Sequence, residues 1–308
     1  MLKVYSLIIE TDLAPAEYGA LLGLVSPEKA KRIARFRRFA DAERSLLGDI
    51  LARHAICLHA GLGNCELKFA LNERQKPYLL APRQPQWRGK PGAPAPAGTD
   101  TGASAHASAP AHAATSVSVF APAPAHFNIS HSGRHVVCAL CSSPVGIDVE
   151  TVKPIGMNIA KRFFSADERE RLFLEPEGGR GRLELFYSIW TRKESFVKMT
   201  GKGLAYPLGD FSVFGGRPDG YGAVRYFRIG VGSGAVCHAC FVPGGAEHAQ
   251  SGVAGIAGHS GVCYGGSECR AGSACCGDGE ICCESAYHAE RVGIGDLLQW
   301  AQGQQQSS

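Results

Sequence analysis

Two acidic side chains at the end of an apolar segment are the first candidates for chemistry. Asp148 and Glu150 lie in Pro144-Val-Gly-Ile-Asp-Val-Glu150, whose β-branched residues indicate a strand. Side chains at i and i+2 of a strand lie on one face, so we expect the two carboxylates side by side. Such a pair repels unless one group is protonated or a cation lies between them, and Mg²⁺ is typically held by one or two carboxylates with water and substrate phosphate. The alternative is a pair of solvated acids.

A predicted helix over residues 182–199 supplies further charged groups. Glu194 and Lys198 are four residues apart and share one face of this helix, at the edge of its apolar stripe, where they could contact a ligand. The alternative is an exposed ion pair, which would contribute only about 0.3 to 0.5 kcal/mol. Lys193 falls inside the apolar arc, and a buried ammonium needs a partner. We therefore expect Lys193 to reach carboxylates or phosphate in the site of Asp148 and Glu150.

A short polar turn follows the segment Phe127-Asn-Ile. It consists of Ser130, His131, Ser132 and Gly133, and its hydroxyl and backbone donors suit phosphate oxygens. A lone histidine after a strand is more often structural. A Ser-His hydrolase is rejected, because adjacent residues at a strand end point apart and no G-x-S-x-G elbow follows any strand.

Basic residues are dense between residues 29 and 44. On composition alone this segment suits a solvated or nucleic-acid-facing surface about as well as a coenzyme site. Its members are Lys29, Lys31, Arg32, Arg35, Arg37, Arg38 and Arg44. Glu168, in Ser165-Ala-Asp-Glu168, fits a capping box, so helix initiation alone accounts for this acid.

The order and spacing of these motifs resemble the 4'-phosphopantetheinyl transferases, in particular the Sfp type that primes peptide and polyketide synthases. The resemblance covers residues 1 to about 82 and 126 to about 241. Besides the motifs above it includes Ser26-Pro-Glu-Lys29, Asp41-Ala-Glu-Arg-Ser-Leu-Leu-Gly-Asp49, Lys76-Pro77, Lys161-Arg-Phe-Phe-Ser165 and Gly201-Lys-Gly-Leu204. A single motif would be a weak signal, whereas this is an ordered set across more than half of the chain.

The resemblance implies transfer of the 4'-phosphopantetheine arm of coenzyme A to a serine of apo acyl or peptidyl carrier domains, with release of adenosine 3',5'-bisphosphate. Such domains belong to nonribosomal peptide, polyketide or fatty acid synthases. Phosphoryl transfer needs mainly positioning and charge neutralisation. The resemblance implies that Asp148, Glu150 and Glu194 ligate Mg²⁺ against the pyrophosphate and that Lys198 stabilises or protonates the departing phosphate. It also implies that Glu194 or Glu150 takes the serine proton.

The same resemblance favours coenzyme A over nucleic acid as the partner of the basic segment. The resemblance implies that Lys198 lies near the pyrophosphate. It also implies that the 3'-phosphate and adenine lie near Lys29, Arg32, Arg44, Lys76, Ser130 and His131. The alternative is a non-catalytic regulator on the same scaffold that binds coenzyme A or nucleic acid. The three acids and both lysines of the central motifs favour the enzyme, because a binding protein does not need an intact metal triad.

The expected fold is α+β, with two similar α/β halves related by pseudo-twofold symmetry and the active site between them. We expect an N-terminal half over 1–82, a disordered Ala/Pro-rich insertion over 83–125, and a C-terminal half over 126–248 that carries the catalytic motifs. A Cys/Gly-rich insertion over 249–286 and a terminal strand, helix and tail over 287–308 follow. Family members with both halves in one chain are monomers, and this chain is expected to be one.

Twelve cysteines invite a metal or disulfide interpretation. Cys138 and Cys141, and likewise Cys237 and Cys240, mimic zinc-ribbon knuckles, but residues three apart in a strand point to opposite faces, so we expect small core residues. The dense cluster consists of Cys263, Cys269, Cys275, Cys276, Cys282 and Cys283. Its spacing resembles a disulfide-knotted miniprotein more than a zinc site, and binding of a soft metal is a hypothesis.

Composition agrees with a globular enzyme of the cytoplasm. The chain has 308 residues, 45% of them hydrophobic, and a formal net charge of +4. The first ten residues lack the apolar region and cleavage site of a signal peptide, and no apolar run is long enough to span a bilayer. We expect no membrane association.

Overall fold

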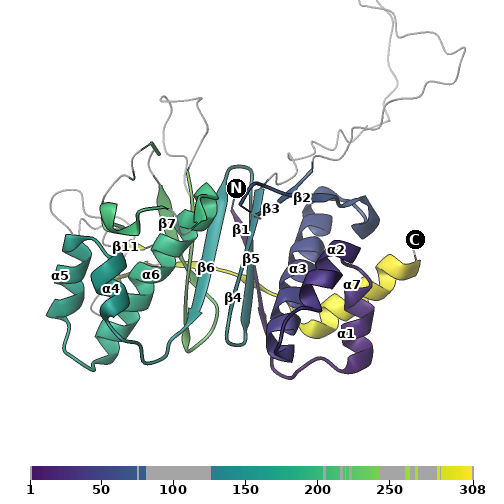
Figure 1. Cartoon of the computed structure of the whole chain (residues 1–308), viewed down its shortest axis with the longest axis horizontal. Helices are drawn as coiled ribbons and strands as arrows, with labels where there is room; N and C mark the ends of the chain where they lie inside the picture. Colours follow the sequence, from purple (N-terminus) through teal and green to yellow (C-terminus); the bar gives the residue numbers. More distant parts are fainter. Residues whose placement is uncertain are drawn as a thin grey trace, which may run out of the picture.

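Strands occupy the centre of the molecule, with helices on either side (Figure 1). The computed structural model describes residues 2–80 except 75, residues 126–242 except 204–205, 216–217, 219 and 222–223, the backbones of 261–263, 268–269 and 283–284, and residues 286–306. The insertion expected at 83–125 and the cysteines at 275, 276 and 282 lie outside the described residues. Within the described part, no helix has the length and apolar character needed to cross a membrane.

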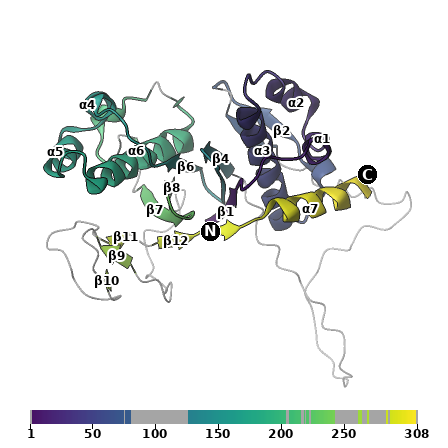
Figure 2. The same ribbon diagram turned by 90° about the horizontal axis from the view of Figure 1, so that it is seen from below.

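The first sheet has the strand order β13-β1-β5-β4. It consists of β1 (Lys3–Ile8), β4 (His126–Ser132), β5 (His135–Cys141) and β13 (Glu290–Arg291). β5 is antiparallel to both β1 and β4, whereas β13 is parallel to β1. The helices of this half are α1 (Pro15–Leu22), α2 (Pro27–Ile33), α3 (Phe39–Ala60) and α7 (Ile294–Gln306). Figure 2 shows α7 beside α3, although the two helices come from opposite ends of the chain.

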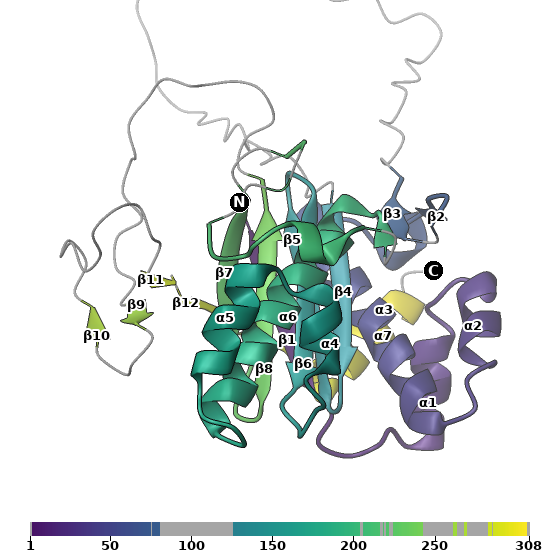
Figure 3. The same ribbon diagram turned by 60° about the vertical axis from the view of Figure 1, so that its left-hand side comes forward.

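The second sheet repeats this pattern of strand directions in the order β12-β7-β8-β6. It consists of β6 (Val145–Thr151), β7 (Arg225–Gly230), β8 (Ala235–Phe241) and β12 (Ala286–His288). β8 is antiparallel to β7 and β6, and β12 is parallel to β7. Helices α4 (Asn158–Phe163), α5 (Ala166–Leu174) and α6 (Arg180–Thr200) lie in front of these strands in Figure 3. The predicted α+β fold with two similar halves is confirmed.

The sheets do not follow the division expected at residue 126. The hairpin of β4 and β5 pairs with β1, so these strands complete the first sheet, and the chain enters the second sheet only at β6. The C-terminal segment also crosses between the halves, because β12 joins β7 and β13 joins β1. Each half therefore contains segments from distant parts of the chain.

Short elements complete the described structure. β2 (Phe69–Leu71) and β3 (Pro77–Leu79) form a hairpin, and β9 (Gly261–Cys263), β10 (Glu268–Cys269) and β11 (Cys283–Glu284) form a small sheet. Single turns of 3-10 helix cover Asn64–Glu66 and Leu208–Asp210. Residues 211–215 form a bend and a turn and no strand. The carbonyls of Leu208 and Phe211 instead accept hydrogen bonds from the buried Lys193 ammonium.

The paired cysteines confirm the predicted alternation. All four are free and buried. Cys138 and Cys240 lie in the cores between each sheet and its helices, whereas Cys141 and Cys237 lie in the apolar layer shared by the two sheets. Their sulfurs therefore point to opposite faces, and they are packing residues.

Glycine allows α6 to lie directly on β6. A Cβ atom at Gly146 would be 1.8 Å from the Ser195 carbonyl oxygen and 2.6 Å from the Met199 amide nitrogen. These are backbone atoms of α6, so no side-chain movement could make room. The position of α6 on the second sheet therefore depends on this residue.

The expectation for Lys193 is wrong. Its Nζ is 2.8 Å from Glu168 Oε2, and both side chains are completely buried. Glu168 also accepts hydrogen bonds from the amides of Ser165 and Val213, both at 2.8 Å, so the predicted capping box is confirmed. The position of Lys193 within the apolar stripe of its helix correctly predicted that the side chain is buried. The side chain faces α5 and the loop after α6, however, and not Asp148 and Glu150. Its partners are structural, because they join three segments of the second half.

We expect Lys193→Met to destabilise the fold by about 3 to 5 kcal/mol, because it leaves the Glu168 carboxylate buried without its cation. The free energy of unfolding in urea measures this loss. The double variant Lys193→Met/Glu168→Gln should be more stable than the sum of the single changes predicts. A loss below about 1 kcal/mol for Lys193→Met would contradict the buried pair.

Gly146→Ala should destabilise the protein by about 3 kcal/mol or more, because its Cβ overlaps the α6 backbone. Gly19→Ala is the matched control. A Cβ at Gly19 would have no heavy atom within 4 Å, and alanine in this helix should leave stability unchanged or slightly higher. Equal midpoints of thermal unfolding for the two variants would refute the close contact.

Candidate active site

The edge strands β4 and β6 belong to different sheets but are joined through side chains. Asn128 Oδ1 accepts a hydrogen bond from the Ile147 amide at 2.9 Å. The hydroxyl oxygens of Ser130 and Ser132 accept from the amides of Val149 at 3.3 Å and Thr151 at 3.1 Å. These alternate polar residues satisfy the edge amides of β6, which would otherwise lack partners. We call Asn128, Ser130 and Ser132 the polar ladder.

The polar ladder also holds the two predicted acids. Ser130 donates to Asp148 Oδ1 at 3.0 Å, and Ser132 donates to Glu150 Oε2 at 2.7 Å. Asp148 and Glu150 therefore face β4 together, as the strand period predicted. Asp148 is buried and Glu150 is half-buried.

Helix α6 brings Lys198 and Glu194 to this contact between β4 and β6, which we call the joint of the two halves. Lys198 Nζ lies 2.6 Å from Asp148 Oδ1 and donates to Ser130 Oγ at 2.8 Å. Glu194 is one helical turn earlier, and burial together with the charges of Asp148 and Glu150 raises its pKa to about 7 despite the opposing effect of Lys198. Burial also raises the pKa of Asp148 and of Glu150. Burial thus disfavours the charged form of all three carboxylates, and the Asp148 charge raises the pKa of Glu150 and of Glu194 further.

The donor set fits a hard divalent cation. Within the described ranges, no three histidine, cysteine or carboxylate side chains are grouped closely enough to hold a metal ion as they stand. The Lys198 ammonium lies against Asp148 and supplies the positive charge there. Asp148 Oδ2 and Glu194 Oε1 are nevertheless buried and make no hydrogen bond. Two unpartnered carboxylate oxygens beside a third acid are the ligand chemistry that Mg²⁺ prefers.

Positive charges gather beside the acids, on the first half. Arg44 Nη1 donates to the Gly133 carbonyl at 3.1 Å, and Lys29 Nζ lies 3.7 Å from Asp49 Oδ2. Desolvation and the charges of Lys198, Arg44 and Lys29 lower the pKa of His131. A histidine in such a positive field is complementary to an anion. Arg32 is exposed on α2, outside these contacts.

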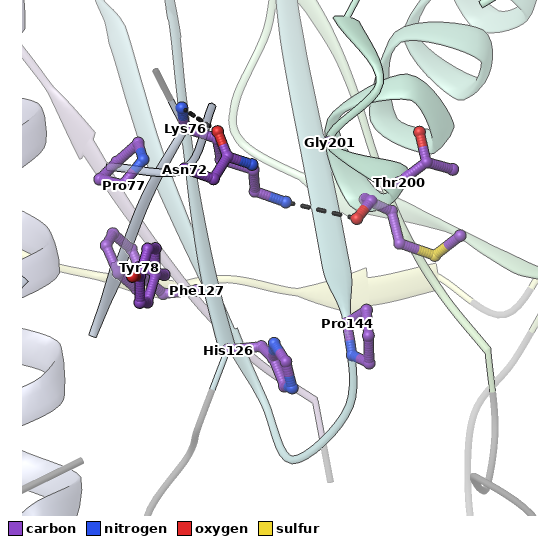
Figure 4. A pocket seen from close by; sticks show the side chains of 10 residues that line it. Asn72, Lys76, Pro77, Tyr78, His126, Phe127, Pro144, Thr200 and Gly201 are labelled. Atoms are coloured by element: carbon purple, nitrogen blue, oxygen red, sulfur yellow. Dashed lines mark hydrogen bonds between the residues drawn. The ribbon is translucent and has the colours of Figure 1, made fainter. Parts of the chain in front are cut away.

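Lys76 has a different environment from the other predicted coenzyme ligands. Its ammonium donates to the carbonyls of Lys198 and Met199, and burial lowers its pKa to about 8. It lines a cavity of about 190 Å³ together with Asn128, Glu194 and Lys198. It also lines a cavity of about 270 Å³ that includes Tyr78 and His126 (Figure 4).

The site thus lies at the joint of the two halves. The first half contributes α2, α3, the β2–β3 hairpin and β4, and the second half contributes β6 and α6. Sequence reasoning missed Asn128, and it named Ser132 only as a donor to phosphate and not as a partner of Glu150. The signal was present, because residues 128, 130 and 132 are all polar and share one face of the strand, whereas Phe127 and Ile129 on the other face are apolar.

Comparison with known proteins agrees with this geometry. Residues 144–237 match a model of the 4'-phosphopantetheinyl transferase superfamily, and residues 13–89 match a model of the 4'-phosphopantetheinyl transferase N-terminal region. The chain is 35% identical over 212 residues to 4'-phosphopantetheinyl transferase Sfp of Bacillus subtilis (strain 168), which covers 69% of this chain and 76% of that protein. It is 28% identical over 211 residues to 4'-phosphopantetheinyl transferase gsp of Aneurinibacillus migulanus, covering 68% and 70%.

Proposed function

Because this chain belongs to the 4'-phosphopantetheinyl transferase family, we propose that the joint between its halves is the Mg²⁺-dependent transfer site. The protein transfers the 4'-phosphopantetheine moiety of coenzyme A to a serine of apo carrier-protein domains, and adenosine 3',5'-bisphosphate leaves. The observation that carries the proposed site is the convergence of Asp148, Glu150, Glu194 and Lys198 on the polar ladder.

Asp148, Glu150 and Glu194 would hold the cation. The unpartnered oxygens of Asp148 and Glu194 and the raised pKa of Glu194 support this set, because all of them indicate a deficit of positive charge. When bound, Mg²⁺ would neutralise charge on the pyrophosphate of coenzyme A.

Lys198 serves the leaving group. The serine oxygen forms a bond to the phosphorus that carries pantetheine, and the bond from this phosphorus to the oxygen of the adenosine-bearing phosphate breaks. The Lys198 ammonium, held at the joint by Asp148 and Ser130, stabilises or protonates the departing oxygen. The serine proton passes to Glu194 or Glu150, directly or through water.

Coenzyme A is recognised mainly by the first half. Lys29, Arg44 and His131 face one region beside Ser130, and their shared positive field suits the phosphates. Arg32 adds charge from the exposed side of α2, and Lys76 lines the cavities on the other side of the joint.

The physiological partners are carrier domains of nonribosomal peptide, polyketide or fatty acid synthases. One chain supplies both halves of the site, which supports action as a monomer. Coenzyme A and carrier proteins are available in the cytoplasm, so the enzyme acts there, and the reaction involves neither nucleic acid nor membrane.

Mass spectrometry of an apo carrier protein incubated with coenzyme A and Mg²⁺ tests the proposed site. Wild-type protein should add one phosphopantetheine per carrier serine, and Glu194→Gln should lower the rate by at least about a hundredfold, because it removes a metal ligand and a candidate proton acceptor. Glu184→Gln is the matched control, since Glu184 lies on the same helix but pairs with Arg180 at the surface. An unchanged rate for Glu194→Gln would refute the assignment.

A second prediction concerns the basic cluster formed by Lys29 and Arg44. Lys29→Met and Arg44→Gln should each raise the KM for coenzyme A by about tenfold, because each removes a charged partner of phosphate. The KM for 3'-dephospho-coenzyme A should change much less. Lys31→Met, which removes the same charge from an exposed position of α2, serves as the control. Equal increases of KM for both substrates would show that these basic residues do not bind the 3'-phosphate.

A further inference from the structure

The C-terminal turn of α6 is completed by residues of the other half. A helix ends with carbonyls that have no partner within the helix. Gly201, in the left-handed conformation with φ 68°, donates from its amide to the Val197 carbonyl at 3.1 Å. The next two carbonyls, of Lys198 and Met199, accept from the ammonium of Lys76. Lys76 thus caps a helix across the joint, where a cation also opposes the helix dipole.

The turn between β2 and β3 is shaped to present this cap. Asn72 Oδ1 accepts hydrogen bonds from the amides of Arg74 and Lys76, both at 2.9 Å. Arg74 Nη1 donates to the carbonyl of Lys202, just beyond α6. Figure 4 shows Lys76 reaching from the hairpin towards the turn that carries Thr200 and Gly201. Two cations of one tight turn therefore bind consecutive parts of the same helix end.

Packing leaves little room at this contact. A Cβ atom at Gly201 would lie 3.3 Å from Asn72 Nδ2 and 3.7 Å from Lys76 Cδ. Glycine is thus favoured twice, by its left-handed backbone and by the closeness of the hairpin. We call Asn72, Arg74, Lys76 and Gly201 the hairpin contact.

Lys198 is held at both ends as a result. Its carbonyl accepts from Lys76, while its ammonium binds Asp148 and Ser130. We propose that Lys76 is a positioning residue, which holds the last turn of α6 so that the Lys198 ammonium stays at the joint. Its ammonium is engaged by backbone carbonyls, so its main contribution is to the transfer step and not to coenzyme A affinity. This inference rests on the proposed role of Lys198.

Measurements of steady-state transfer and of equilibrium coenzyme A binding distinguish a positioning role of Lys76 from a role in binding coenzyme A. Lys76→Met should lower kcat at least about tenfold, since small displacements of a reacting group are costly. Its Kd for coenzyme A, measured by calorimetry without carrier protein, should stay within about threefold of wild type. Lys76→Arg should recover most of kcat, because a guanidinium can donate to both carbonyls.

An independent variant reaches the same contact without removing a charge. Gly201→Ala should lower kcat with little change in Kd, because its Cβ pushes against Asn72 in a backbone conformation that alanine disfavours. Glu73→Gln, an exposed change within the same turn, should leave both quantities at wild-type values. If circular dichroism shows that Lys76→Met is unfolded, Lys76→Gln is used in its place, because glutamine keeps an N–H donor.

A raised Kd with unchanged kcat in Lys76→Met would overturn the inference and make Lys76 a coenzyme ligand. Wild-type kcat in both Lys76→Met and Gly201→Ala would overturn it as well. The variant Lys198→Met shows whether a negative result concerns the positioning role of Lys76 or the proposed function itself. Loss of transfer in Lys198→Met with normal Lys76→Met refutes only the positioning role, whereas normal transfer in Lys198→Met refutes the role of Lys198 itself.

Discussion

The polar ladder between β4 and β6 is the contact on which the site depends. Two sheet edges meet there without pairing their backbones, and three side chains of β4 satisfy the exposed amides of β6. Because the same serine hydroxyls donate to Asp148 and Glu150, one set of atoms joins the halves and orients the acids. A continuous sheet would use the edge amides for strand pairing and would leave no cleft between the halves.

Helix α6 brings the remaining charges to this joint, and its position is over-determined. Gly146 lets its backbone touch β6, the Lys193–Glu168 pair fastens its opposite side to α5, and the hairpin contact caps its end. Glu194 and Lys198 project between these three attachments. A helix anchored by so many contacts holds its reactive groups with little freedom, which is what phosphoryl transfer requires of its surroundings.

Charge balance ties the two halves into one site. The second half supplies three carboxylates whose burial raises their pKa values, and the first half supplies Lys29, Arg44 and His131 nearby. Each set is compensated only in part within its own half, where Lys198 faces Asp148, Asp49 faces Lys29 and Asp41 faces Arg44. A divalent cation would compensate the carboxylates, and phosphate groups would compensate the basic residues, so a substrate carrying a pyrophosphate and a further phosphate complements the joint.

Local periodicity accounts for the predictions that hold. The period of two placed Asp148 beside Glu150 and separated the sulfurs of Cys138 and Cys141, and the period near four placed Glu194 and Lys198 on one face. These relations lie within one strand or one helix, where backbone geometry alone sets the direction of each side chain. The capping box at Glu168 held for the same reason.

Partners across the chain were decided only by the tertiary structure. The helical period predicted that Lys193 is buried but could not identify Glu168, Leu208 and Phe211 as its partners. Likewise nothing local assigns β4 and β5 to the first sheet or directs Lys76 to the end of α6. The chemical groups, their local faces and the family follow from the order of the amino acids alone. Which groups meet depends on how sheets and helices pack, because such contacts join residues far apart in the chain.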